Sequence, residues 1–251
     1  MPHKQNHRGA NPRDAKSFSD KQLPDLKQAL EHLNYLLSRD YNPKSSLKLV
    51  GDRFRFTERQ RRAIAHSACG EKELKERRAK HVSADQIAGK KIAVDGYNQL
   101  ITMEAALSKA PVFIGTDGCY RDIASVHGTY RRVEETIPAL ELFAKFFEEM
   151  NPEKVLWVFD KPISNSGRLK QMIQTLADEK GWRWDVTLDF NPDKYIAEKE
   201  GWIAVSSDSW VLDNSDQWLN LNAYLIDKHV PDAWLIDFEN IKTDNECKSG
   251  M

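Results

Sequence analysis

Four short apolar runs, rich in β-branched and aromatic residues, constrain what the second part of this chain can fold into. They are KIAVD at 91–95, KVLWVFD at 154–160, WIAVSSD at 202–208 and AWLIDF at 233–238. Stretches with helical spacing, including 133–150 and 166–180, lie between them. Strands that alternate with helices favour a largely parallel sheet with helices on its faces. The sequence therefore predicts an α/β domain.

The first part of the chain is predicted to be helical. Capping-box patterns begin at Ser19 and Thr57, and Asn42 followed by proline marks another helix start. The residues before Ser19 are polar, and the segment before the first apolar run contains turn-forming residues. The predicted organisation is a disordered leader at 1–18, a basic helical domain at 19–80, a linker at 81–90 and the α/β domain at 91–251.

The two parts differ in charge. Residues 1–89 contain 19 Lys and Arg against 11 Asp and Glu, whereas the remaining residues contain 18 against 27, so that the net charge is −1. This split is expected if one module holds a polyanion and the other holds metal, but charge alone is better explained by a solvated basic surface without a ligand. A helix-turn-helix is not identifiable, and phosphate contact is the simpler expectation. The candidates for that contact are Arg53, Arg55, Arg59, Arg61 and Arg62.

The cysteines and the N-terminus bear on location. Cys69, Cys119 and Cys247 are widely spaced and form no C-x-x-C pair. The polar N-terminus lacks the apolar core of a signal peptide, and no apolar run approaches the length of a membrane span. We therefore expect a cytoplasmic protein without a membrane partner.

Three of the apolar runs lead directly into an aspartate: Asp95, Asp160 and Asp208. The carboxyl ends of parallel strands share one edge of a sheet, where ligands bind. Carboxylates held within ~4–6 Å of one another are costly unless a cation neutralises them, and hard oxygen ligands favour Mg²⁺ or Mn²⁺ over zinc. One such aspartate alone is better explained as a turn former or helix cap. Three together predict a metal site.

Two further aspartates extend this prediction. Asp193 opens a helix-like segment just upstream of the run that ends at Asp208, and Asp213 lies five residues beyond that run. We expect both to face the same pocket.

These patterns resemble the PIN-like nuclease superfamily, especially its NYN branch. The resemblance rests on VDGYN after the first run, Asp160 after the second, D-x-x-I-A at Asp193 and S-S-D at Asp208, and it covers roughly residues 90–240. The whole layout also resembles an uncharacterised prokaryotic family that joins a small basic helical domain to a PIN-like domain.

The resemblance implies a Rossmann-like three-layer fold and a metal-dependent phosphodiesterase, usually a ribonuclease. Asp95, Asp160, Asp193 and Asp208 would take the places of the catalytic residues that bind one or two Mg²⁺ or Mn²⁺ ions. Such an ion lowers the pKa of a bound water and neutralises charge on the leaving oxygen. Asn98 would hold the ribose, a phosphate or a metal-bound water. The preference for RNA over DNA rests on the resemblance alone.

The chain departs from a minimal domain of this kind in one extended segment, residues 103–132. The segment is rich in polar groups, which suits either a lid over the substrate or an exposed loop. A lone histidine such as His127 is also explained as a structural residue. The candidate substrate-binding residues in this segment are Arg121, His127, Arg131 and Arg132.

Two other functions remain open. The aspartates could belong to a catalytically inactive module that binds nucleic acid or protein, or to a phosphatase of small molecules. The absence of a D-x-D pair after the first run argues against the phosphatase. The sequence does not decide whether the chain is a monomer or a homodimer, or whether it cuts within a strand or from its end.

Overall fold

The computed structural model describes residues 7–124 and 128–238. The helices are α1 (Asp14–Ser17), α2 (Leu23–Leu37), α3 (Pro43–Arg53), α4 (Glu58–Ser67), α5 (Glu71–Lys80), η1 (Ala84–Ile87), α6 (Gly96–Leu107), α7 (Thr136–Met150), α8 (Ser166–Lys180), α9 (Pro192–Ala197), α10 (Ser209–Asn214) and α11 (Leu221–His229). The strands are β1 (Lys91–Asp95), β2 (Val112–Ile114), β3 (Tyr120–Asp122), β4 (Lys154–Asp160), β5 (Trp184–Asp189), β6 (Trp202–Val205), β7 (Trp218–Leu219) and β8 (Leu235–Asp237).

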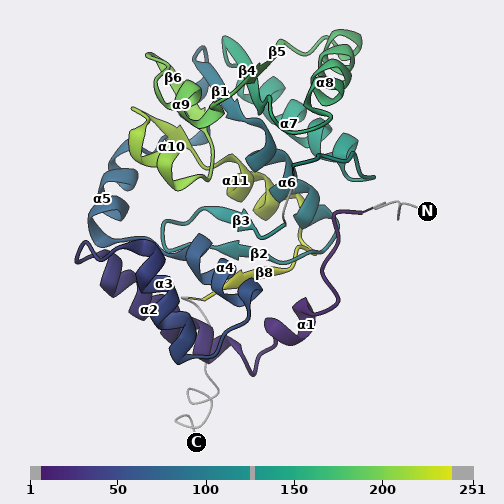
Figure 1. Cartoon of the computed structure of the whole chain (residues 1–251). Coiled ribbons are helices and arrows are strands. Elements are labelled where there is room, and N and C mark those ends of the chain that lie inside the picture. Colours follow the sequence, from purple (N-terminus) through teal and green to yellow (C-terminus); the bar gives the residue numbers. More distant parts are fainter. Residues whose placement is uncertain (1–6, 125–127, 239–251) are drawn as a thin grey trace, which may run out of the picture.

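A five-stranded parallel sheet in the order β5-β4-β1-β6-β7 forms the centre of the α/β part. Ile92 and Val94 of β1 face a core shared with α6, α7, α8 and α11, whereas Ala93 faces a smaller core with α9 and α10. Helices therefore cover both faces of the sheet (Figure 1). The predicted α/β class with three layers is confirmed.

The fourth apolar run does not join this sheet, which corrects the expectation of four strands in one parallel sheet. β8 pairs with β2 in a separate three-stranded sheet of order β3-β2-β8. Ile236 and Phe238 face Phe113 of β2 in a second core. The run that forms β8 is apolar, as are the runs that form the central strands. Its sequence therefore does not show which of the two sheets it joins.

The N-terminal helices pack against this small sheet rather than around a core of their own. Leu26, Ile64 and Phe113 belong to one buried cluster, which joins α2, α4 and β2. The predicted caps at Asn42 and Thr57 are present. The capping box predicted at Ser19 is absent, because α2 begins at Leu23 without a side-chain cap.

The part of the predicted disordered leader that the structure describes is packed, and that prediction is wrong for residues 8–18. Arg8, Asp14 and Phe18 are all buried. The Arg8 guanidinium donates to the buried Glu104 carboxylate at 2.6 and 2.8 Å. A polar segment can therefore be ordered when its charges pair with buried carboxylates elsewhere in the chain.

None of the helices in the described ranges is both long enough and apolar enough to cross a membrane.

The Arg8–Glu104 pair gives a first prediction. Arg8→Ala leaves a buried carboxylate without its cation, so we expect it to lower the free energy of unfolding by about 3 kcal/mol. Thermal and urea unfolding measure this change.

Arg13→Ala is the matched control, because Arg13 is an exposed arginine of the same segment. The control should change stability by less than about 0.5 kcal/mol. Equal stabilities of the two variants would contradict the assigned role of Arg8.

Candidate functional site

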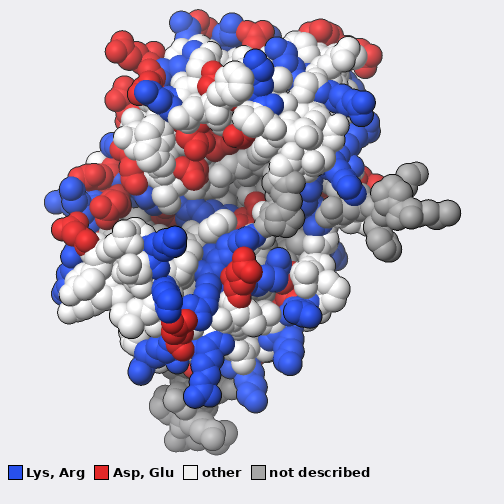
Figure 2. Space-filling view, in the orientation of Figure 1, with Lys and Arg blue, Asp and Glu red and all other residues white. Residues whose placement is uncertain are grey.

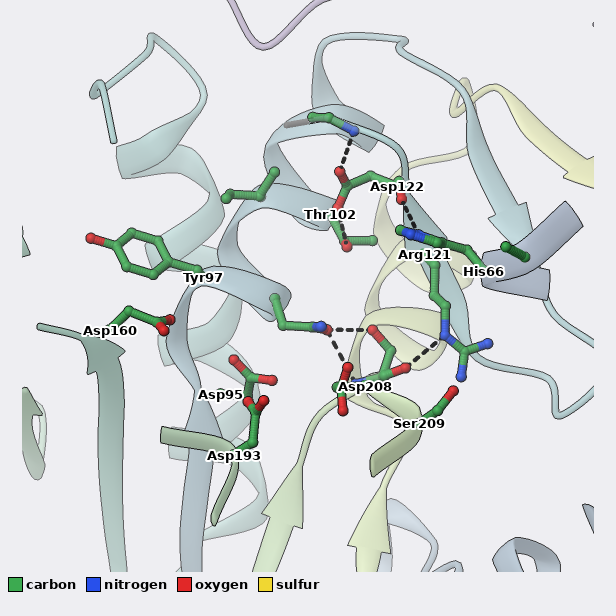
Figure 3. A pocket seen from close by; sticks show the side chains of 15 residues that line it. His66, Asp95, Tyr97, Thr102, Arg121, Asp122, Asp160, Asp193, Asp208 and Ser209 are labelled. Carbon is green, nitrogen blue, oxygen red and sulfur yellow. Dashed lines mark hydrogen bonds between the residues drawn. The ribbon is translucent and has the colours of Figure 1, made fainter. Parts of the chain in front are cut away.

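Four aspartates from four elements line one cavity of about 370 Å³ at the carboxyl edge of the parallel sheet. Asp95 and Asp160 end β1 and β4, and Asp208 is the N-cap residue of α10 just beyond β6. Asp193 lies in the first turn of α9. Figure 3 shows Asp95, Asp160 and Asp193 close to one another on one side of this cavity. The structure thus brings together the four aspartates that the sequence singled out.

The cavity raises the pKa of three of these carboxyl groups. Asp95 is only 4% exposed, and its pKa is raised well above the usual value by burial and by the charges of Asp193, Asp208 and Asp160, against the lowering effect of Ser206. Burial, together with Asp208 and Asp160, raises the pKa of Asp193 to about 6. Burial also raises the pKa of Asp160.

Within the described residues, no positive side chain pairs with these carboxylates. In the described ranges, none of the four aspartates forms an ion pair with a Lys, Arg or His residue. Figure 2 shows acidic residues around the hollow in the upper, α/β half of the molecule, and many Lys and Arg residues in the lower, helical half. Hard oxygen donors with raised pKa values are suited to a divalent cation such as Mg²⁺ or Mn²⁺.

The four carboxylates are suited to a cation, but their side chains are not arranged as in a preformed metal site. Among the residues that the structure describes, no three His, Cys, Asp or Glu side chains already stand at metal-binding spacing. Binding of an ion would therefore also have to draw the aspartates together.

Hydrogen bonds hold the Ser-Ser-Asp segment against β1 and α6. The Ser206 hydroxyl donates to Asp95 Oδ2 at 2.7 Å and accepts from the Asp208 N–H at 2.9 Å. Asn98 Oδ1 accepts from both the N–H and the hydroxyl of Ser207. Asn98 was predicted to contact substrate, and it lines the cavity, but its carbonyl oxygen is already used to position this segment.

A buried ion network stands behind the Ser-Ser-Asp segment. Arg121 pairs with Asp117 at 2.6 Å and donates through Nε to the Ser207 carbonyl at 2.6 Å. Arg77 of α5 bridges Asp117 and Asp213, each at 2.6 Å. Sequence analysis did not indicate that Arg77 supports the site, because its partners Asp117 and Asp213 lie 40 and 136 residues away along the chain.

This network corrects two predictions. Asp213 does not face the acidic cavity, because its carboxylate is bound to Arg77. Arg121 lines the cavity, but its guanidinium is committed to Asp117 and Ser207, which makes it a positioning residue rather than a free substrate contact.

The other predicted arginines lie away from the acidic cavity. Arg131 and Arg132 line a separate cavity beside α8. His127 lies outside the described residues. Arg59 pairs with the buried Asp14, which argues against the predicted phosphate contact, and Arg61 pairs with Asp52. For Arg53, Arg55 and Arg62 contact with nucleic acid stays a prediction, and none of these three lines the cavity.

The helical N-terminal region contributes directly to the cavity wall, which the sequence did not indicate. Ala65 and His66 of α4 line it, and Figure 3 shows His66 on the side opposite Asp160. His66 Nδ1 lies 3.0 Å from the carbonyl oxygen of Asp122, which also lines the cavity. The predicted helical domain is therefore a part of the site and not only a neighbouring module.

Comparison with known proteins places the chain in a family. The family model described as "Domain of unknown function (DUF5616)" matches residues 84–224, more than half of the chain. The chain belongs to this family. All four aspartates lie within the DUF5616 region, whereas His66 lies within residues 25–80, which match "Protein of unknown function (DUF434)".

One relative resembles most of the chain. It is an uncharacterized protein, MJ0935, of Methanocaldococcus jannaschii, which is 27% identical over 184 residues, or 73% of this chain and 87% of the relative. No solved structure matches the chain.

The crowding of carboxylates predicts that removing one of them stabilises the protein. The pKa of Asp193 is raised in the folded state, so the native state binds more protons and stability is lost as the pH rises through about 6. At pH 7.5 in EDTA we therefore expect Asp193→Asn to unfold with a free energy higher by on the order of 1 kcal/mol, discounted for partial exposure.

Thermal unfolding between pH 4 and pH 8 measures this effect, and the gain should vanish near pH 4. Asp216→Asn, which changes an exposed aspartate outside the cavity, should leave stability unchanged at every pH. A loss of stability in Asp193→Asn at pH 7.5 would contradict the claim that the charge of Asp193 destabilises the fold.

The buried ion network predicts that removing the charge of Asp117 destabilises the protein, in contrast to Asp193. The pKa of Asp117 is lowered to about 2, because Arg121 and Arg77 outweigh the effect of burial. We expect Asp117→Asn to cost about 3 kcal/mol at pH 7. Since a lowered pKa stabilises the fold only above the unfolded value, the difference from wild type should shrink as the pH falls from 4 to 2. A difference that is constant with pH in urea unfolding would refute this assignment.

Proposed function

We propose that this chain is a divalent-cation-dependent phosphodiesterase that cleaves nucleic acid, with RNA preferred over DNA. The observation that carries the proposal is the set of four aspartates from β1, β4, α9 and α10 on one cavity, without a positive partner in the described ranges. The resemblance of VDGYN and S-S-D to PIN-like nucleases points to the same reaction. A reducing cytoplasm is the compartment that we propose for it.

Mg²⁺ or Mn²⁺ held by Asp95, Asp160, Asp193 and Asp208 would supply Lewis-acid catalysis and neutralise the charge that develops on the phosphate. The chain's own residues hold these carboxylates in place. Ser206 orients Asp95 through its hydroxyl, and Asp208 is fixed because it also caps α10 by accepting from the N–H groups of Trp210 and Val211. Such support restricts the orientations of Asp95 and Asp208 before substrate arrives.

The charge distribution also supports a nucleic-acid substrate. The acidic cavity would bind the scissile phosphate only with a cation present, whereas the basic helical half offers Lys and Arg to the rest of a polyanion (Figure 2). A small phosphate ester would gain nothing from that second surface. We therefore favour the nuclease over the small-molecule phosphatase.

Cleavage assays test the proposal. Labelled single-stranded RNA, structured RNA and single-stranded DNA are incubated with Mn²⁺, with an EDTA control. We expect wild type to cut RNA, and Asp95→Asn and Asp208→Asn to lose at least about 100-fold in rate, because each removes a charge from the site. Asp216→Asn is the matched control and should cut normally.

The asparagine at position 208 retains a capping oxygen, so lost activity of that variant would not reflect a lost helix cap. Cleavage that persists in both site variants would contradict the proposed site. Oligonucleotide binding without any cleavage by wild type would favour the inactive binding module instead.

A further inference from the structure

His66 is one of the cavity's side chains that the proposed chemistry does not use. His66 comes from α4 of the helical region and lies on the far side of the cavity from Asp160 (Figure 3). In the figure its ring stands beside Asp122 and Arg121, away from the cluster of Asp95 and Asp193. A side chain in this place would touch the substrate at a distance from the cation.

The hydrogen bond of His66 determines which of its nitrogens faces the ligand. Nδ1 lies 3.0 Å from the main-chain carbonyl of Asp122, and a carbonyl oxygen only accepts, so Nδ1 carries a proton. Nε2 has no hydrogen-bond partner in the described part of the chain. The anchor is itself held, because the Asp122 carboxylate accepts from Thr102 Oγ1 at 2.8 Å and from the Ala124 N–H at 2.7 Å.

The charge state of His66 follows from its surroundings. The ring is open to the cavity but close to protein on other sides, and this burial lowers its pKa below the ordinary value of 6.5. Asp122 of β3 acts in the opposite direction, whereas Arg121 of β3 and Arg62 of α4 add to the lowering. Near neutral pH the imidazole is therefore uncharged, and Nε2 offers a lone pair.

The chemistry of a nucleic acid indicates the partner of this lone pair. Carboxylates accept hydrogen bonds, and Asn98 Oδ1 and the Ser207 hydroxyl are already bonded to each other. A phosphodiester has no proton to donate to Nε2, and the N–H donors of the nucleobases differ from base to base. A ribose 2′-hydroxyl is both donor and acceptor, and it is the group that distinguishes RNA from DNA.

We propose that His66 Nε2 accepts a hydrogen bond from a ribose 2′-hydroxyl and makes the cavity selective for RNA. This inference rests on the proposed nuclease function and names the residue that selects its substrate. It also gives the helical region a role in specificity, because that region supplies the side chain.

Binding assays separate this role from cleavage. Fluorescence anisotropy compares matched oligonucleotides with ribose, 2′-deoxyribose or 2′-fluororibose, with Ca²⁺ in place of Mn²⁺. The fluoro sugar retains an RNA-like pucker but has no proton to donate. We expect wild type to bind the ribose form about threefold to tenfold more tightly than either of the other forms, as one neutral hydrogen bond contributes.

Substitutions at His66 identify the acceptor. His66→Ala should bring the ratio of the affinities close to one, while His66→Gln, which retains an acceptor oxygen, should recover part of it. His32→Ala is the matched control, because His32 belongs to α2 and lines a different cavity. Thermal unfolding of each variant checks that it is folded.

The outcomes of these assays distinguish failure of this inference from failure of the proposed nuclease function. The inference is overturned if wild type binds the three oligonucleotides with equal affinity, or if His66→Ala retains the full preference for ribose. Neither result contradicts Mn²⁺-dependent cleavage. If wild type neither binds nor cuts oligonucleotides, both proposals fail.

Discussion

The crowding of four buried or half-buried aspartates at one edge of a parallel sheet is the constraint on which the rest of the structure depends. Parallel strands bring their carboxyl ends to one edge, so Asp95 and Asp160 become neighbours once β1 and β4 pair. Burial and, in addition, repulsion among the carboxylates raise the pKa of Asp95 and of Asp193, which means that the fold holds these side chains together at a cost. Groups with shifted pKa values gather chiefly where proteins bind a ligand, and a bound cation, as proposed, would relieve this repulsion.

The residues that hold the cavity in place extend well beyond the parallel sheet. Arg121 and Arg77 share Asp117, and through Ser207 and Asp213 they connect the small sheet, α5 and α10 to the cavity. The helical region reaches the same cavity through α4. Residues of the N-terminal helical region and of the parallel sheet therefore line the same cavity.

The sequence predicted the features that arise from local pattern. The apolar runs that end in aspartate predicted strands at one sheet edge, and helical spacing predicted α8 at residues 166–180. Asp193 was placed correctly at the start of a helix. These features follow from periodicity of two or 3.6 residues and from the geometry of parallel strands.

The features that the sequence missed depend on partners far along the chain. Asp213 faces Arg77, which lies 136 residues away, and Arg8 is ordered by Glu104, 96 residues away. The run that forms β8 has the same composition as the central strands, so only its pairing with β2 distinguishes it. His66 carries no local pattern at all, since its role comes from the packing of α4 against β3.

A cation among the four aspartates is the central claim, and crystals grown or soaked with Mn²⁺ test it most directly through anomalous scattering. The account predicts an anomalous peak in the cavity within about 2.5 Å of oxygens from at least two of these aspartates, and its loss in Asp95→Asn crystals prepared in the same way. A cavity that shows no peak at millimolar Mn²⁺, or a peak held only by other residues, would contradict the account.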